Sequence, residues 1–232
     1  MVLSDSKYSC AYTCLKSNIG MSVTNKVFCI GFQKTGTTSL GEALEMLGFR
    51  VTGVFGTEDP DMSSYVVQHA LKVAENYDAF QDFPWAVLYR ELDVAFPESK
   101  FILTVRPEGE WMASVTKHFG CRSKPMRTWI YGIGYPAGNE GIYLERYDRH
   151  NREVVEYFKD RPGDLLVLKL TEGEGWRELC GFLGCSVPSD EFPSSNTSKV
   201  RRKRRIRRYM RHPVKSVLGL LRSYARSLAA SA

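Results

Sequence analysis

The sequence has little of what metal-bound, disulfide-linked or membrane-spanning proteins are built from. No stretch approaches the roughly 18–20 apolar residues of a membrane span. Residues 1–25 lack the continuous apolar core of a signal peptide. The six cysteines form no Cys-x-x-Cys pair and the four histidines are not clustered, which predicts neither a zinc site nor a disulfide framework. We therefore expect a cytoplasmic protein with reduced thiols and no metal.

Acidic residues are absent between Lys199 and Ala232, where 12 of the 32 Lys and Arg residues lie. This leaves 20 basic against 26 acidic residues in positions 1–198, so the net charge of +6 hides an acidic body and a basic tail. The division argues against a uniformly basic nucleic-acid-binding domain. We predict an irregular N-terminal arm (1–25), one globular domain (26–198) and a basic tail (199–232).

Short apolar, β-rich runs alternate with helical periodicity along the body, which predicts the α/β class: a three-layer α/β/α domain with a central parallel sheet. A stretch rich in Gly, Pro and Tyr, 120–138, is expected to be irregular. The expected strands are 27–32, 49–55, 79–82, 100–106 and 165–170, and the expected helices are 38–47, 64–76, 84–96, 108–118, 140–159 and 175–183.

The loop after the first expected strand has the composition of an anion-binding loop. It reads Gly-Phe-Gln-Lys-Thr-Gly-Thr-Thr-Ser-Leu from Gly31 to Leu40 and opens a helix, whose start offers backbone N–H groups and a partial positive charge. A glycine turn without a ligand is the simpler reading, which the lysine and the hydroxyls disfavour. The nucleotide-hydrolase pattern G-x-x-x-x-G-K-[ST] is not met, because Thr37 follows Gly36 and the lysine lies earlier, at Lys34.

The run Lys34-Thr-Gly-Thr-Thr38 resembles the 5′-phosphosulfate loop of the sulfotransferases. The resemblance implies a fold like that of the P-loop nucleoside triphosphate hydrolases and a donor, 3′-phosphoadenosine 5′-phosphosulfate. It implies that the donor is bound by seven residues of the loop: Gln33, Lys34, Thr35, Gly36, Thr37, Thr38 and Ser39.

A second motif of the same family is present later in the chain. Sulfotransferases end a buried strand with an arginine and place a serine eight residues later, both on the 3′-phosphate of the donor, and Arg106 and Ser114 match this spacing. Pro107 directly follows the arginine, where relatives commonly have it one place later, and Trp111 stands where they often carry an aromatic residue. In isolation, such a pair is more commonly a surface ion pair and a solvated hydroxyl. A third and weaker resemblance covers 175–193.

The resemblance implies transfer of a sulfuryl group to an acceptor hydroxyl or amine, with Lys34 stabilising the leaving phosphate. Asp82 stands where these enzymes carry the catalytic base, although an aspartate of ordinary pKa, about 3.9, is a weak base unless burial raises it. The alternative for Asp82 is a helix N-cap ahead of Pro84. His118 is the second choice as base, and a partly exposed structural histidine is its alternative. Residues 120–138 are expected to line the acceptor pocket or cover it.

Two other functions remain open at this stage: a P-loop kinase or nucleotidase, and an inactive module that acts through its basic tail. The strand over 101–105 ends in arginine rather than in the aspartate with which hydrolases hold magnesium, so no metal is expected. The basic run 201–208 fits nuclear import, nucleic acid or an acidic surface. An apolar helical face over 217–228 favours an anionic membrane surface over nucleic acid, with a solvated tail as the alternative.

Overall fold

Five parallel strands form one sheet, in the order β2-β3-β1-β4-β5. The structure is a computed structural model that describes residues 26–194. The predicted arm (1–25), the basic tail (199–232) and its expected membrane-surface helix lie outside the described residues. The strands are β1 (Val27–Cys29), β2 (Val51–Thr52), β3 (Ala79–Gln81), β4 (Lys100–Thr104) and β5 (Leu165–Leu168).

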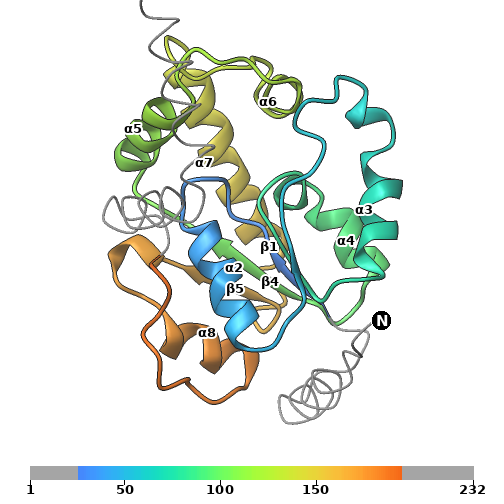
Figure 1. Ribbon diagram of the computed structural model, residues 1–232, viewed down its shortest axis with the longest axis vertical. Helices are drawn as coiled ribbons and strands as arrows, with labels where there is room; N and C mark the ends of the chain where they lie inside the picture. Colours follow the sequence, from blue (N-terminus) through green and yellow to red (C-terminus); the bar gives the residue numbers. More distant parts are fainter. Residues whose placement is uncertain (1–25, 195–232) are drawn as a thin grey trace, which may run out of the picture. The chain divides into compact units, whose positions relative to one another are not determined.

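The described residues also form seven α-helices, drawn in Figure 1. Short 3-10 turns lie at Met62–Ser64, Trp85–Val87 and Leu170–Glu172. Within residues 26–194, no helix combines the length and apolar character that crossing a bilayer requires. The helices are α2 (Thr37–Met46), α3 (Val66–Ala74), α4 (Tyr89–Ala95), α5 (Glu108–Phe119), α6 (Pro125–Tyr131), α7 (Glu140–Tyr157) and α8 (Trp176–Leu183).

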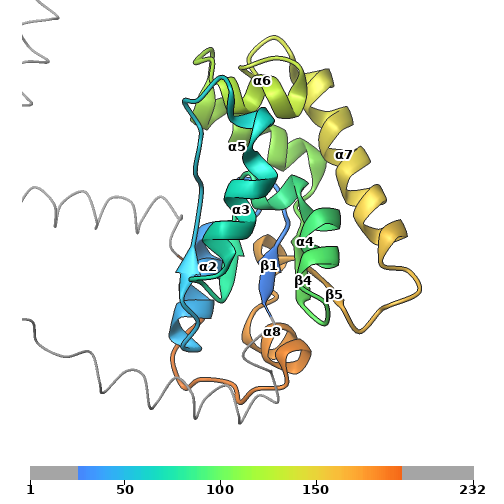
Figure 2. The same cartoon turned by 90° about the vertical axis from the view of Figure 1, so that its right-hand side faces the viewer.

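Alternation of side chains along the strands creates two apolar cores, one on each face of the sheet. Val27 and Cys29 of β1 pack with α2 and α8, whereas Phe28 packs on the other face with α3, α4 and α7. The rings of Phe80 and Phe101, on the neighbouring strands, lie in register with Phe28 at centroid distances of 4.8 and 5.4 Å. These layers confirm the predicted three-layer α/β/α fold (Figure 2).

The structure differs from the sequence-based expectation in three local features. The strands are shorter than predicted, and β1 ends at Cys29, just before the loop. The helix expected over 84–96 is divided into the 3-10 turn Trp85–Val87 and α4. The segment expected to be irregular contains α6, which starts at Pro125 and ends at Gly132 in a left-handed conformation. Proline at the first position and glycine after the last are typical helix boundaries.

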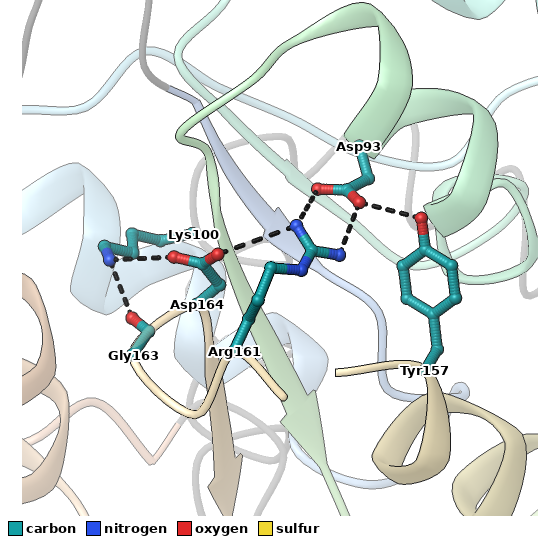
Figure 3. Close-up of polar contacts among 6 residues, drawn as sticks. All are labelled: Asp93, Lys100, Tyr157, Arg161, Gly163 and Asp164. Carbon is teal, nitrogen blue, oxygen red and sulfur yellow. Dashed lines mark hydrogen bonds and ion pairs between the residues drawn. The ribbon is translucent and has the colours of Figure 1, made fainter. Parts of the chain in front are cut away.

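A polar network joins α4 to the end of α7 and to the start of β4, at the amino-terminal end of the strands (Figure 3). Arg161 donates to both carboxylate oxygens of Asp93, at 3.1 and 2.7 Å, and the Tyr157 hydroxyl donates to Oδ2 of Asp93 at 2.8 Å. Asp164 continues the network to Lys100 at the start of β4. Burial would raise the pKa of Asp93, but these hydrogen bonds outweigh it and hold the pKa below its ordinary value.

We predict that Arg161→Ala lowers the free energy of unfolding by about 1–2 kcal/mol at pH 7, because Asp93 loses its bidentate partner. Because the pKa of Asp93 is lowered by folding, its stabilisation is present above the ordinary pKa of aspartate and is lost as pH falls. The difference from the wild type should therefore shrink below about pH 4. Urea unfolding at pH 7 and pH 3.5 measures both effects.

Arg152→Ala is the matched control, because Arg152 pairs with Asp148 on the exposed surface of α7. It should change stability by less than about 0.5 kcal/mol. Equal losses in the two variants would contradict the account of the network.

Candidate functional site

The loop after β1 is seated against β4 by a contact that only glycine allows. A Cβ on Gly31 would lie 2.0 Å from Oγ1 of Thr104 and 2.5 Å from its carbonyl oxygen. The Thr35 hydroxyl donates to the Phe32 carbonyl at 2.6 Å and lies 2.6 Å from the Thr104 hydroxyl. Thr35 is therefore buried and holds the loop closed, rather than facing outward.

Gln33, in the same loop, is held by two aromatic residues. Its carbonyl accepts from Nε1 of Trp111, in α5, at 2.9 Å, and its Nε2 donates to the Tyr131 hydroxyl, in α6, at 2.8 Å. Trp111 stacks on Tyr147 at 4.1 Å, and the Tyr147 hydroxyl bonds both the N–H and the carbonyl of Arg106. A chain of buried contacts thus fixes the loop against the β4–α5 turn, and Gln33 has a positioning role.

The start of α2 has the features of an anion site. Gly36 has a φ of 108°, which favours glycine, and a Cβ there would lie 2.9 Å from Cδ1 of Leu170. No side chain caps α2, and its first turn holds no acidic residue. No carboxylate of that turn therefore compensates the partial positive charge at the start of the helix. Thr37 and Ser39 are buried and Thr38 is half-buried.

Lys34 and Asp82 both have left-handed backbones, with φ of 73° and 70°. Among the described residues, Glu98 is the third and last residue other than glycine with positive φ. Such conformations cost energy and concentrate at functional sites. The two residues predicted to do the chemistry follow the carboxyl ends of β1 and β3, which are neighbouring parallel strands of the sheet.

Burial raises the pKa of Asp82, against smaller opposing effects of the Phe83 N–H, which donates to Oδ1 at 2.9 Å, and of the Lys34 charge. The residue as a whole is nevertheless only partly buried. The sequence left open that Asp82 is a helix N-cap, but the structure excludes this. Pro84 occupies the cap position of the 3-10 turn that follows, and no side chain caps that turn. The ordinary pKa assumed from the sequence is therefore corrected upward.

Arg106 lies at the predicted end of β4, immediately before α5. Its guanidinium, 25% exposed, donates to Oε2 of Glu110 at 3.1 and 3.2 Å. This is the surface ion pair that the sequence offered as the alternative, and an exposed pair one helical turn apart contributes little stability. Ser114 follows two turns along α5 and is half-buried. The carboxyl-end position of Arg106 is as expected, and a phosphate would compete with Glu110 for it.

His118 is placed differently from Asp82. It lies in the last turn of α5, about 15 Å along the helix axis from the end that adjoins Arg106. The residue is exposed, and its ring packs on Phe119 at 4.7 Å. This position favours a surface role for His118, so Asp82 is the better candidate for the base.

Helix α6 and the start of α7 cover this end of the sheet (Figure 1). The ring of Tyr131 stacks on Tyr143 at 3.9 Å and meets Phe32 and Phe83 edge-on. Phe83 directly follows Asp82, and its ring lies 6.3 Å from that of Tyr131. Tyr131, which the sequence placed in an acceptor-pocket segment, therefore packs against the residue next to the candidate base.

Residues 26–141 and 124–200 match the sulfotransferase domain family. This match covers most of the chain. The chain belongs to the sulfotransferase domain family. It is also 26% identical over 216 residues to "Ava biosynthesis cluster protein M" of Aspergillus versicolor, covering 75% of this chain and 81% of that protein. Among residues 26–194, no group of three or more His, Cys, Asp or Glu side chains is arranged to hold a metal ion.

Sequence reasoning missed Tyr147 and Glu110. Tyr147 lies 41 residues from Arg106, so no local pattern links the two. Glu110, by contrast, follows Arg106 at the i+4 spacing of a helical ion pair, which the sequence could have indicated.

We predict that Asp82→Asn raises the melting temperature at pH 7. A raised pKa means that folding favours the protonated carboxyl, so the ionised form costs stability above that pKa, and the amide removes this cost. The gain should vanish below about pH 4, where the wild-type carboxyl is also neutral. Thermal unfolding from pH 3.5 to 7.5 tests this, with Asp160→Asn, at an exposed position, as control. A lower melting temperature at pH 7 would contradict the prediction.

Proposed function

We propose that this sulfotransferase-family chain transfers a sulfuryl group from 3′-phosphoadenosine 5′-phosphosulfate to an acceptor hydroxyl or amine. The observation that carries the proposal is the position of Lys34 and Asp82, both in left-handed conformations, after the neighbouring strands β1 and β3, with Lys34 in the loop that leads to the uncapped start of α2. A cation and helix N–H groups suit the phosphosulfate, and a carboxylate of raised pKa suits proton removal from an acceptor. Family membership supports the same reaction class.

The residues of the loop fit the donor's 5′ end. The backbone around Gly36 and the first turn of α2 would bind the 5′-phosphate, with the hydroxyls of Thr37 and Thr38 beside it. When the sulfuryl group leaves, negative charge develops on the bridging phosphate oxygen. The Lys34 ammonium would stabilise this charge.

Asp82 would accept the proton of the acceptor as the acceptor oxygen or nitrogen bonds to sulfur. The sulfur–oxygen bond to the phosphate breaks in the same step, and the bond's electron pair leaves with adenosine 3′,5′-bisphosphate. Because burial raises the pKa of Asp82, its carboxylate is a stronger base than an exposed aspartate. Arg106 and Ser114 would bind the 3′-phosphate, with Arg106 exchanging Glu110 for it.

We predict that Lys34→Ala lowers kcat by about 100-fold or more, because the leaving phosphate loses its cation. Transfer from radiolabelled donor to a panel of phenols, sugars and amines measures this, with the exposed Lys117→Ala as control. Near-normal turnover by Lys34→Ala would contradict the assignment of Lys34 as the residue that stabilises the leaving phosphate.

We also predict that Asp82→Asn lowers kcat by about 100-fold or more and removes the acidic limb of the pH profile, since the amide cannot take a proton. The same transfer assay across pH 4–8 measures both, and Asp160→Asn is the control. Full activity with an unchanged acidic limb would place the base elsewhere.

Thermal shift separates this function from its rivals. The proposal requires stabilisation by adenosine 3′,5′-bisphosphate, reduced in Arg106→Ala, whereas a kinase would respond to ATP with magnesium. Binding of the bisphosphate without transfer to any acceptor would instead support the inactive module.

A further inference from the structure

Arg146, on α7, is a half-buried arginine whose charge has no ion-pair partner in the described part of the chain. Its Nε donates to the Ile130 carbonyl at 3.2 Å, and the guanidinium lies 5.4 Å from the centre of the Phe32 ring. Its Nη1 is fully buried and, among residues 26–194, has no hydrogen-bond partner. Glu153 acts on it only through its more distant charge, and burial is the chief cause that lowers the pKa of Arg146.

Arg127, on α6, is a useful comparison: it too has no carboxylate partner among residues 26–194, but two of its guanidinium nitrogens bond backbone carbonyls. It is 8% exposed, and its Nε donates to the Gly134 carbonyl at 2.9 Å while its Nη2 donates to the Arg122 carbonyl. Its guanidinium also lies 4.5 Å from the centre of the Phe119 ring. At Arg146, by contrast, the buried Nη1 group has no acceptor among residues 26–194, which costs free energy that packing alone does not return. A ligand oxygen, and a carboxylate oxygen above all, would satisfy this donor.

His150 lies one helical turn after Arg146 on the same side of α7. Its Nε2 lies 2.8 Å from the Ile30 carbonyl, which assigns the proton to Nε2 and leaves Nδ1 as an acceptor. Nδ1 is buried and, in the described residues, has no partner. Burial lowers the pKa of His150 to about 3, so the ring is neutral and does not compete for an anion. The ring stacks on Phe32 at 4.3 Å.

These groups are linked to the candidate base through Tyr131. The Tyr131 ring meets the Phe32 ring edge-on at 5.8 Å, and the Tyr131 hydroxyl accepts a hydrogen bond from the Gln33 amide. The Phe32 ring, over which Arg146 lies, also meets Phe83, the residue after Asp82, edge-on at 4.9 Å. Arg146 therefore packs against the aromatic cluster that adjoins the candidate base.

We propose that Arg146 binds a carboxylate of the acceptor, so that the acceptor class is hydroxylated carboxylic acids. The carboxylate would accept a hydrogen bond from Nη1 of Arg146, and the hydroxyl of the same acceptor would bind beside Asp82. This acceptor assignment rests on the proposed transfer reaction, whereas carboxylate binding by Arg146 does not.

Stability provides the first test, and it requires no knowledge of the ligand. In the free full-length protein, Arg146→Met should leave the melting temperature unchanged or raise it, because an unmet charge is removed. Arg127→Met, the matched control, should lower it by about 4 °C or more, because paired hydrogen bonds are lost. A comparable loss in Arg146→Met would assign Arg146 a structural role and overturn the proposal.

Binding provides the second test. Three acids of increasing length are compared with their methyl esters in the presence of adenosine 3′,5′-bisphosphate: 4-hydroxybenzoate, 4-hydroxyphenylacetate and 3-(4-hydroxyphenyl)propionate. Calorimetry should show at least one acid binding the wild type more tightly than its ester. Arg146→Gln should weaken the binding of that acid by about 30-fold and leave the affinity for the ester unchanged.

If no acid binds better than its ester, or if Arg146→Gln leaves the preference intact, the proposal is overturned. Failure of the transfer reaction is recognised separately, by absence of bisphosphate binding and of sulfated product, and does not alter the calorimetric comparison. Where transfer occurs, the same preference should appear in KM rather than in kcat.

Discussion

The close approach of Gly31 to Thr104 is the contact on which the site depends. A side chain at position 31 would overlap the hydroxyl, N–H and carbonyl of Thr104, so glycine lets the chain leave β1 against the neighbouring strand. The Thr35 hydroxyl then bonds the loop to Thr104, and Trp111 bonds its other side. The loop is thereby closed by neutral groups before any ligand arrives, so its ordering does not draw on binding energy.

Neutral and charged residues have separate tasks in this arrangement. Thr35, Gln33 and Trp111 are buried, and they bond the Phe32 carbonyl, the Tyr131 hydroxyl and the Gln33 carbonyl, respectively. Lys34 and Asp82 occupy strained left-handed positions, and the ion-pair partner of Arg106 among residues 26–194 is an exposed glutamate. Strain and incompletely compensated charge are the usual cost of a site prepared for a charged ligand. Arg146 extends the same pattern to the side of α7.

Local motifs explain how much of the site the sequence could predict. Lys34 and the loop are contiguous, and Arg106 is marked by the end of the clearest buried strand, so spacing found them. The raised pKa of Asp82 could not be predicted from the sequence, because it depends on how deeply the folded chain buries the carboxyl group. The bond from Trp111 to Gln33 joins residues 78 apart, which no periodicity reports. The layers of the fold followed from alternation of strands and helices, whereas the seven-residue helix α6 was too short to detect among Gly, Pro and Tyr.

A crystal structure of the full-length chain with adenosine 3′,5′-bisphosphate tests the central claim most directly. We expect the 5′-phosphate at the start of α2 within hydrogen-bonding distance of Lys34 Nζ, and the 3′-phosphate on Arg106 after its release from Glu110. A bisphosphate bound elsewhere, or one whose 5′-phosphate touches neither Lys34 nor the first turn of α2, would contradict it.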